Sequence, residues 1–183
     1  QDFDGALTAY EKAIALRQDS FEAWFGKGAV LRKLERYEEA IAVYEQAIHI
    51  KGDSPLVYYN KGLSALDIGQ YEEAVTDLSQ AIQLKPDFQK AWLQKSLALR
   101  KLQRYPEAEA ACLKATQLNP EDAEARYAQA CCDALQNNVD SAIDDLKLAI
   151  QLGTGISERA KQEPDLQALQ ESAAFHNLLH PKE

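Results

Sequence analysis

A spacing of 34 residues recurs through most of this chain of 183 residues, and it constrains the fold more than any other feature. The same kinds of residue return at this spacing in several registers, some aromatic and some small. These registers hold Trp24, Tyr58 and Trp92; Gly28, Gly62 and Ser96; Phe3, Tyr37, Tyr71 and Tyr105; and Ala6, Ala40, Ala74, Ala108 and Ala142. Agreement among several registers predicts an architecture built by stacking one short unit on itself.

Each unit has the pattern of two helices. In residues 55–88, Tyr58, Gly62 and Ala65 are spaced by four and three residues, which places them on one helical face. After a break in this pattern, a second apolar face indicates a second helix, and Pro86 marks its end. Because a helix of about 13 residues is not stable alone in water, the units are expected to bury a continuous core by stacking.

The residues in these registers resemble the tetratricopeptide repeat, a family of helix–turn–helix units of about 34 residues. The matching residues are Trp24, Gly28, Tyr37, Ala40, Tyr44 and Ala47; Tyr58, Gly62, Tyr71, Ala74, Leu78, Ala81 and Pro86; and Trp92, Tyr105, Ala108, Ala115 and Pro120. The amino-acid sequences of the units are similar to those of bacterial members of the family. The resemblance covers about residues 1–152 and implies an all-α, right-handed superhelical solenoid of antiparallel helix pairs.

The spacing divides the chain into one half repeat, four full repeats and a C-terminal segment. We place the repeat array at residues 1–152 and capping helices at residues 153–183. The units are expected at about residues 1–20, 21–54, 55–88, 89–122 and 123–156. Gly153 and Gly155 break the period, and Pro164 stops what begins as a sixth first helix. The C-terminal segment either caps the exposed end of the last unit, which we favour, or docks in the groove of the array itself.

Composition excludes several classes of protein. The chain has 20 Lys and Arg against 29 Asp and Glu, a net charge of −9, which argues against a general nucleic-acid binder. No apolar stretch approaches the length of a membrane-spanning helix, and no signal peptide is visible, so we expect a cytoplasmic protein. Methionine is absent even at position 1, which predicts that the chain is a fragment.

The residue types that carry catalysis are not arranged for it. His176 and His180 have the spacing of two metal ligands on a helix, but no third ligand lies near them at zinc-site spacing. Cys112 occupies a core register, and Cys131 has no histidine placed to activate its thiol. Glycine-rich phosphate loops are absent as well. We therefore expect a protein that is not an enzyme and that has no catalytic residue, metal site or cofactor.

The resemblance implies that the first helices of the units line a concave groove that holds peptides or segments of partner proteins. Beside the buried registers of these helices runs a stripe of aromatic and aliphatic residues, followed by a basic pair in two of the units. The groove candidates are Phe25, Arg32, Lys33, Tyr59, Asn60, Leu63, Lys90, Leu93, Gln94, Leu97, Arg100, Lys101 and Tyr127. The alternative is that these residues only pack between adjacent units and complement the helix dipoles.

These observations predict a non-catalytic protein–protein interaction module, or scaffold, that binds a partner with apolar anchors and acidic groups. Family members that clamp a C-terminal carboxylate use five positions, of which only Asn60 and Lys90 fit here, so such a reader is disfavoured. One alternative is a substrate-recruiting arm of a larger enzyme such as a kinase or glycosyltransferase. Another is a self-assembling module, because the sequence leaves the oligomeric state open.

Overall fold

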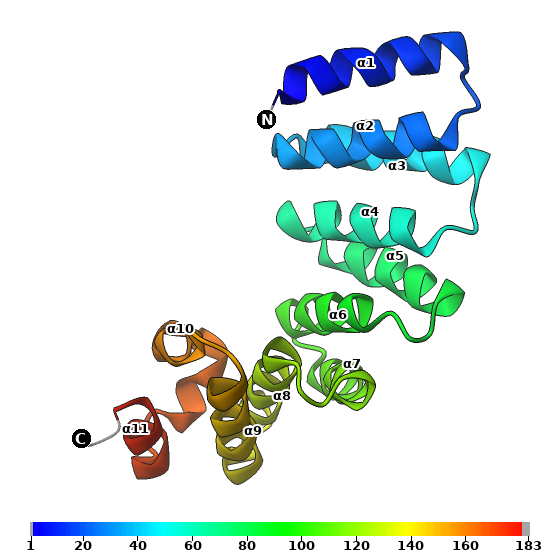
Figure 1. The fold of residues 1–183 in the computed structure, drawn as a ribbon. Helices are drawn as coiled ribbons and strands as arrows, with labels where there is room; N and C mark the ends of the chain where they lie inside the picture. The colour runs from blue at the N-terminus through cyan, green and yellow to red at the C-terminus, as the bar shows by residue number, and fades with distance from the viewer. Residues whose placement is uncertain (1, 181–183) are drawn as a thin grey trace. The chain divides into compact units, whose positions relative to one another are not determined.

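The computed structural model describes residues 2–180, and the regular elements of this part of the chain are all helices (Figure 1). They are α1 (Phe3–Leu16), α2 (Phe21–Lys33), α3 (Tyr37–Ile50), α4 (Pro55–Asp67), α5 (Tyr71–Leu84), α6 (Gln89–Lys101), α7 (Tyr105–Leu118), α8 (Ala123–Leu135), α9 (Val139–Leu152), α10 (Ile156–Gln162), the 3-10 helix η1 (Pro164–Leu169) and α11 (Ala173–Leu179). The predicted all-α solenoid of helix pairs is confirmed. Among residues 2–180, every helix is too short or too polar to cross a membrane.

The second helix of each 34-residue repeat begins at the same position of that repeat. These helices start at Phe3, Tyr37, Tyr71, Tyr105 and Val139, which are successive members of one register. The turn before them also repeats, with a left-handed backbone at Glu35, Gly69, Gln103 and Asn137. Glycine adopts this conformation without steric cost, whereas the other three residues are strained there. The 34-residue period therefore fixes the turn geometry as well as the helices.

The glycine register is explained by close packing between the two helices of one repeat. A Cβ atom at Gly28 would lie 2.5 Å from Cε1 of Tyr44, and one at Gly62 would lie 2.9 Å from Cγ of Leu78. The rings and branches that approach these glycines are themselves fully buried. The small residue on the first helix thus makes room for the large residue on the second.

Contacts within the chain group it into two compact units, residues 1–91 and residues 92–183. In the first unit, α1 to α5 are stacked in chain order, from blue to green in Figure 1. Its core includes Leu7, Leu31, Ala40, Val43, Tyr44, Ala47 and Val57. The core of the second unit combines α8 and α9 with the C-terminal helices through Tyr127, Ala130, Cys131, Ala134, Ala142, Leu146, Ala149, Ile156, Ala160, Leu166, Leu169, Phe175 and Leu179.

Arg126 stands where earlier units have Trp24, Tyr58 or Trp92, and it keeps part of the role of the aromatic residue. The indole nitrogen of Trp24 donates to the carbonyl of Gln18 at 2.8 Å. Nε of Arg126 donates to the carbonyl of Pro120, six residues earlier in the same way, at 3.1 Å. Arg126 also pairs with Asp145 on α9 at 2.8 Å. In the last full repeat, polar contacts of Arg126 therefore take the place of the contacts that an aromatic ring makes in the other repeats.

Candidate functional site

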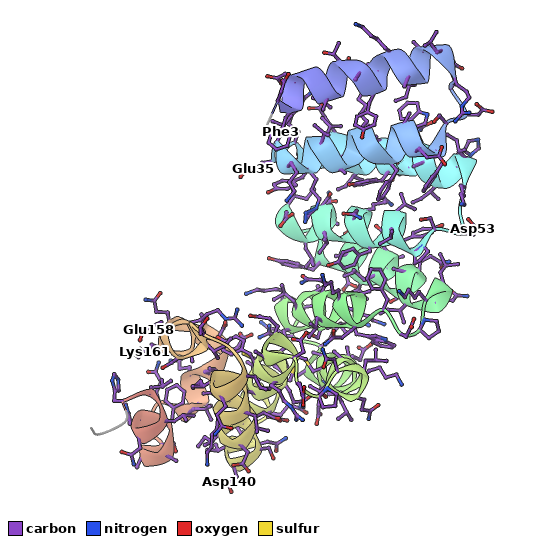
Figure 2. The ribbon with its side chains drawn as sticks, in the orientation of Figure 1. Phe3, Glu35, Asp53, Asp140, Glu158 and Lys161 are labelled. Atoms are coloured by element: carbon purple, nitrogen blue, oxygen red, sulfur yellow. The ribbon has the colours of Figure 1, made fainter. Side chains whose placement is uncertain are left out.

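Six of the predicted groove residues lie on two neighbouring helices of the first unit. We call them the first-unit stripe, and they are Phe25, Arg32 and Lys33 on α2 and Tyr59, Asn60 and Leu63 on α4. The two helices contact one another. The side chains are half-buried except for Lys33, which is exposed. In Figure 2, Glu35, which follows α2, lies at the left of these helices, and Asp53, which precedes α4, lies at their right. The structure thus places these six residues on two helices that contact one another, and none of the six is fully buried.

Aromatic neighbours hold the rings of the first-unit stripe in place. The ring of Phe25 stacks on Phe21 with centroids 5.8 Å apart and lies 6.0 Å from the ring of Tyr44. The ring of Tyr59 lies 4.8 Å from that of Phe88. These contacts also belong to the packing of the unit, as the alternative interpretation of the stripe requires. They leave a surface whose rings are already fixed before any partner arrives.

The guanidinium of Arg32 is the least satisfied polar group of this face. Its Nε is buried without a hydrogen-bond partner, and Arg32 forms no ion pair within residues 2–180. Burial raises the pKa of both Tyr44 and Tyr59, while the nearby charge of Arg32 opposes that rise. An arginine held beside aromatic rings offers a planar fork of donors that matches a carboxylate. Arg32 is therefore suited to an acidic group of a partner.

Asn60 has only part of its hydrogen-bonding capacity free. Its side-chain amide donates to the carbonyl of Leu56, one turn earlier in α4, at 2.8 Å. An asparagine side chain carries two donors and one acceptor oxygen. Its predicted role in the groove therefore stays a prediction, and only the remaining donor and the oxygen are available for it.

The predicted residues of α6 differ in exposure. Lys90, at the start of the helix, and Lys101, at its end, are exposed. Leu93, Gln94 and Leu97 are half-buried. Their role in binding stays a prediction.

Arg100 and Tyr127 are covered by the C-terminal helices of the chain itself. The side chain of Arg100 is 8% exposed and donates to the carboxylate of Asp165 in η1. Tyr127 is 4% exposed, and its hydroxyl donates to Glu163 at 3.1 Å. The guanidinium of Arg159 on α10 lies 3.8 Å from the centre of the Tyr127 ring. These two groove candidates are not open to a partner in this structure.

The C-terminal segment contacts both α8 and α9. α10 and α11 pack against α9, while η1 lies mainly against α8 (Figure 1). Leu166 and Leu169 of η1 are fully buried with Tyr127 and Cys131. Capping of the last repeat and docking in a groove stay the two interpretations that the sequence offers for this segment. Sequence reasoning missed Glu163 and Asp165 as the partners of Tyr127 and Arg100, because Pro164 between them marks only the end of the repeat pattern.

The cysteines form a buried cluster in the second unit. The sulfur atoms of Cys112 on α7 and Cys132 on α8 are 3.0 Å apart and fully buried. Burial raises the pKa of Cys131 to about 12, which keeps that thiol protonated at neutral pH. Among the described residues, no group of three or more His, Cys, Asp or Glu side chains is placed to hold a metal ion.

Comparison with known proteins identifies the pattern. The family model described as tetratricopeptide repeat matches residues 1–55 and 59–120. The crystal structure of YrrB, titled a TPR protein with an unusual peptide-binding site, is 25% identical with a TM-score of 0.76, covering 88% of this chain and 84% of that one. The crystal structure of MamA is 21% identical with a TM-score of 0.79, covering 88% and 92%.

A third similar structure contains a bound peptide. The second TPR domain of the human RPAP3 protein, in complex with the HSP70 peptide SGPTIEEVD, is 29% identical with a TM-score of 0.57. The match covers 58% of this chain and 89% of that one. A search of curated proteins gave no match.

Proposed function

Since the chain belongs to the tetratricopeptide repeat family, we propose that it is a non-catalytic protein-interaction module that binds a segment of a partner on the first-unit stripe. The observation that carries this proposal is Arg32, a half-buried arginine without an ion pair in residues 2–180, whose charge acts on the nearby rings of Tyr44 and Tyr59. Two structural neighbours whose titles name a peptide-binding site or a bound peptide, YrrB and RPAP3, support the general role.

The mechanism is recognition by a surface that is formed in advance. The two helices that carry the stripe are fixed by the core of the first unit, and the rings of Phe25 and Tyr59 are held by their aromatic neighbours. Little side-chain freedom is then lost on binding, so more of the contact energy appears as affinity. Phe25, Tyr59 and Leu63 would supply apolar contact, and Arg32 and Lys33 would pair with acidic groups.

A library of random peptides displayed on phage tests this function without knowledge of the natural partner. Peptides selected on the full chain are expected to lose binding to the Arg32→Glu variant. They should keep binding to Lys12→Glu, which makes the same charge change at an exposed position of α1. Failure to select any peptide that depends on Arg32 would contradict the proposed site.

A further inference from the structure

The repeat period relates one covered site in the second unit to one open site in the first. Arg100 lies two periods after Arg32, Tyr127 lies two periods after Tyr59, and Cys131 follows Leu63 by the same interval. In each unit the arginine is near the end of one first helix, and the other two residues are on the next first helix. The Nε atoms of both arginines are buried without a hydrogen-bond partner. The two arginines thus occupy equivalent positions and share a buried Nε atom without a hydrogen-bond partner.

In the second unit this set of residues already has an occupant. Asp165 accepts from Nη1 of Arg100, and Glu163 accepts from the hydroxyl of Tyr127. The leucines at positions 166 and 169 complete the contact by burying their side chains beside Tyr127 and Cys131. The occupant is the 3-10 helix η1 with the Glu163 that precedes it, and the sequence of residues 163–169 is Glu-Pro-Asp-Leu-x-x-Leu. It combines a carboxylate with apolar side chains one and four residues later.

In the first unit the equivalent residues lack such an occupant among residues 2–180. Tyr59 and Leu63 are half-buried, whereas Tyr127 and Cys131 are buried. Arg32 has no carboxylate comparable to Asp165 within the described residues. The difference in exposure corresponds to what η1 covers in the second unit.

We propose that the first unit binds a partner segment with the chemistry of the chain's own η1, an acidic residue followed by apolar residues one and four positions later. The acidic side chain pairs with Arg32, and the two apolar side chains cover Tyr59 and Leu63. This inference rests on the proposed function and specifies the class of partner. The occupant is a segment of a different protein, because within each copy η1 is already used by the second unit.

A synthetic peptide with the sequence of residues 162–171, QEPDLQALQE, is a direct probe of this site. The full chain keeps its own η1 in the second unit, where the covalent link gives that segment an effective concentration in the millimolar range. Labelled peptide added at lower concentration is therefore directed to the first unit. We expect saturable binding that is about tenfold weaker or more when the peptide carries Asp165→Asn, because a charge-assisted hydrogen bond is lost. Replacing both leucines of the peptide by alanine should abolish binding.

Variants of the protein decide which unit is occupied. Arg32→Gln should remove binding, while the control Lys12→Gln should leave it unchanged. Arg32→Gln breaks no ion pair within residues 2–180, so its thermal unfolding should match the wild type and show that the loss is local. Binding that survives Arg32→Gln but disappears in Arg100→Gln would place the peptide in the second unit and overturn the inference.

The phage selection separates this inference from the function on which it rests. Enriched peptides that depend on Arg32 and carry the acidic-apolar spacing support both. Peptides that depend on Arg32 but lack that spacing keep the function and refute the inference. Peptides that never depend on Arg32 refute both. A second copy of the chain is the other possible occupant, and light scattering over a dilution series tests for it. A mass that rises with concentration in the wild type but not in Arg32→Gln would assign the site to a second copy and refute the inference.

Discussion

Removing the carboxylate of Asp165 should loosen the C-terminal segment by an amount that the structure allows to be worked out. The side chain of Arg100 is 8% exposed and that of Asp165 is 19% exposed, so the pair is largely desolvated. Breaking such a pair by removing one partner costs about 3–5 kcal/mol. The partial exposure of Asp165 favours the lower end, about 3 kcal/mol.

This loss should not detach the segment altogether. Leu166, Leu169, Phe175 and Leu179 are all buried in the core of the second unit. Each buried side chain of this size contributes roughly 1.5–3 kcal/mol, so the four together exceed the loss of the ion pair. Asp165→Ala is therefore expected to leave the segment bound but to make its opening about a hundredfold more frequent, since 1.4 kcal/mol is about a factor of ten.

Amide hydrogen exchange measures this opening directly. The amides to follow are those of Leu166, which donates to Glu163 at 3.1 Å, and Gln170, which donates to Gln167 at 3.1 Å. Their protection should fall about a hundredfold in Asp165→Ala. The matched control is Glu171→Ala, which removes an exposed carboxylate from the same segment and should change protection little.

A double substitution tests the reason for the loss. In Arg100→Leu with Asp165→Leu no unpaired charge is left in the core, so most of the protection should return. A change in Asp165→Ala no larger than that in Glu171→Ala would refute the reasoning. So would a double variant as unprotected as the single one.

Three further predictions concern stability. Gly69→Ala should destabilise the chain by about 1 kcal/mol in urea denaturation, because its φ of 76° disfavours a side chain while no atom lies closer than 4.0 Å to the added Cβ; an unchanged midpoint would contradict this. Gly28→Ala should cost about 1–3 kcal/mol, because the new Cβ would lie 2.5 Å from the buried ring of Tyr44; a thermal midpoint equal to the wild type would show that the ring can move. Burial raises the pKa of Asp133 to about 6, above its unfolded value, so this carboxyl destabilises the fold as the pH rises from about 4 through 6. Asp133→Asn should therefore stabilise the chain by roughly 1–2 kcal/mol at pH 7 and have no effect at pH 4, and a gain that is equal at both pH values would assign it to another cause.

The helices of this protein follow from the sequence because their signals are local. Phe3, Tyr37 and Tyr71 share one register, and each begins a second helix. The left-handed turns are harder to predict from the sequence. A glycine such as Gly69 favours that conformation, but Glu35 adopts it as well and nothing in the residue type indicates it. The repeat forces the backbone of Glu35 because the helices on both sides are packed in the same way.

The sequence predicts which residues line the candidate site but not which of them the chain itself covers. The sequence register makes Arg32 and Arg100 equivalent, and in the structure both have a buried Nε atom without a hydrogen-bond partner. What distinguishes them is a contact between residues 65 positions apart in the chain, Arg100 and Asp165. No local pattern specifies such a contact. Pro164 shows where the period ends but not where the segment then lies.

Site-specific photo-crosslinking tests most directly whether a partner binds the first-unit stripe. A photoreactive amino acid in place of Leu63 lies on the proposed surface, and one in place of Leu16 lies on α1 at a position that is 89% exposed. Both variants of the full chain would be illuminated in the presence of a peptide selected on the wild type. We predict a crosslink from position 63 that Arg32→Glu removes, and none from position 16. Crosslinking from position 16 alone, or from both positions whatever residue stands at 32, would contradict the binding site proposed for this protein.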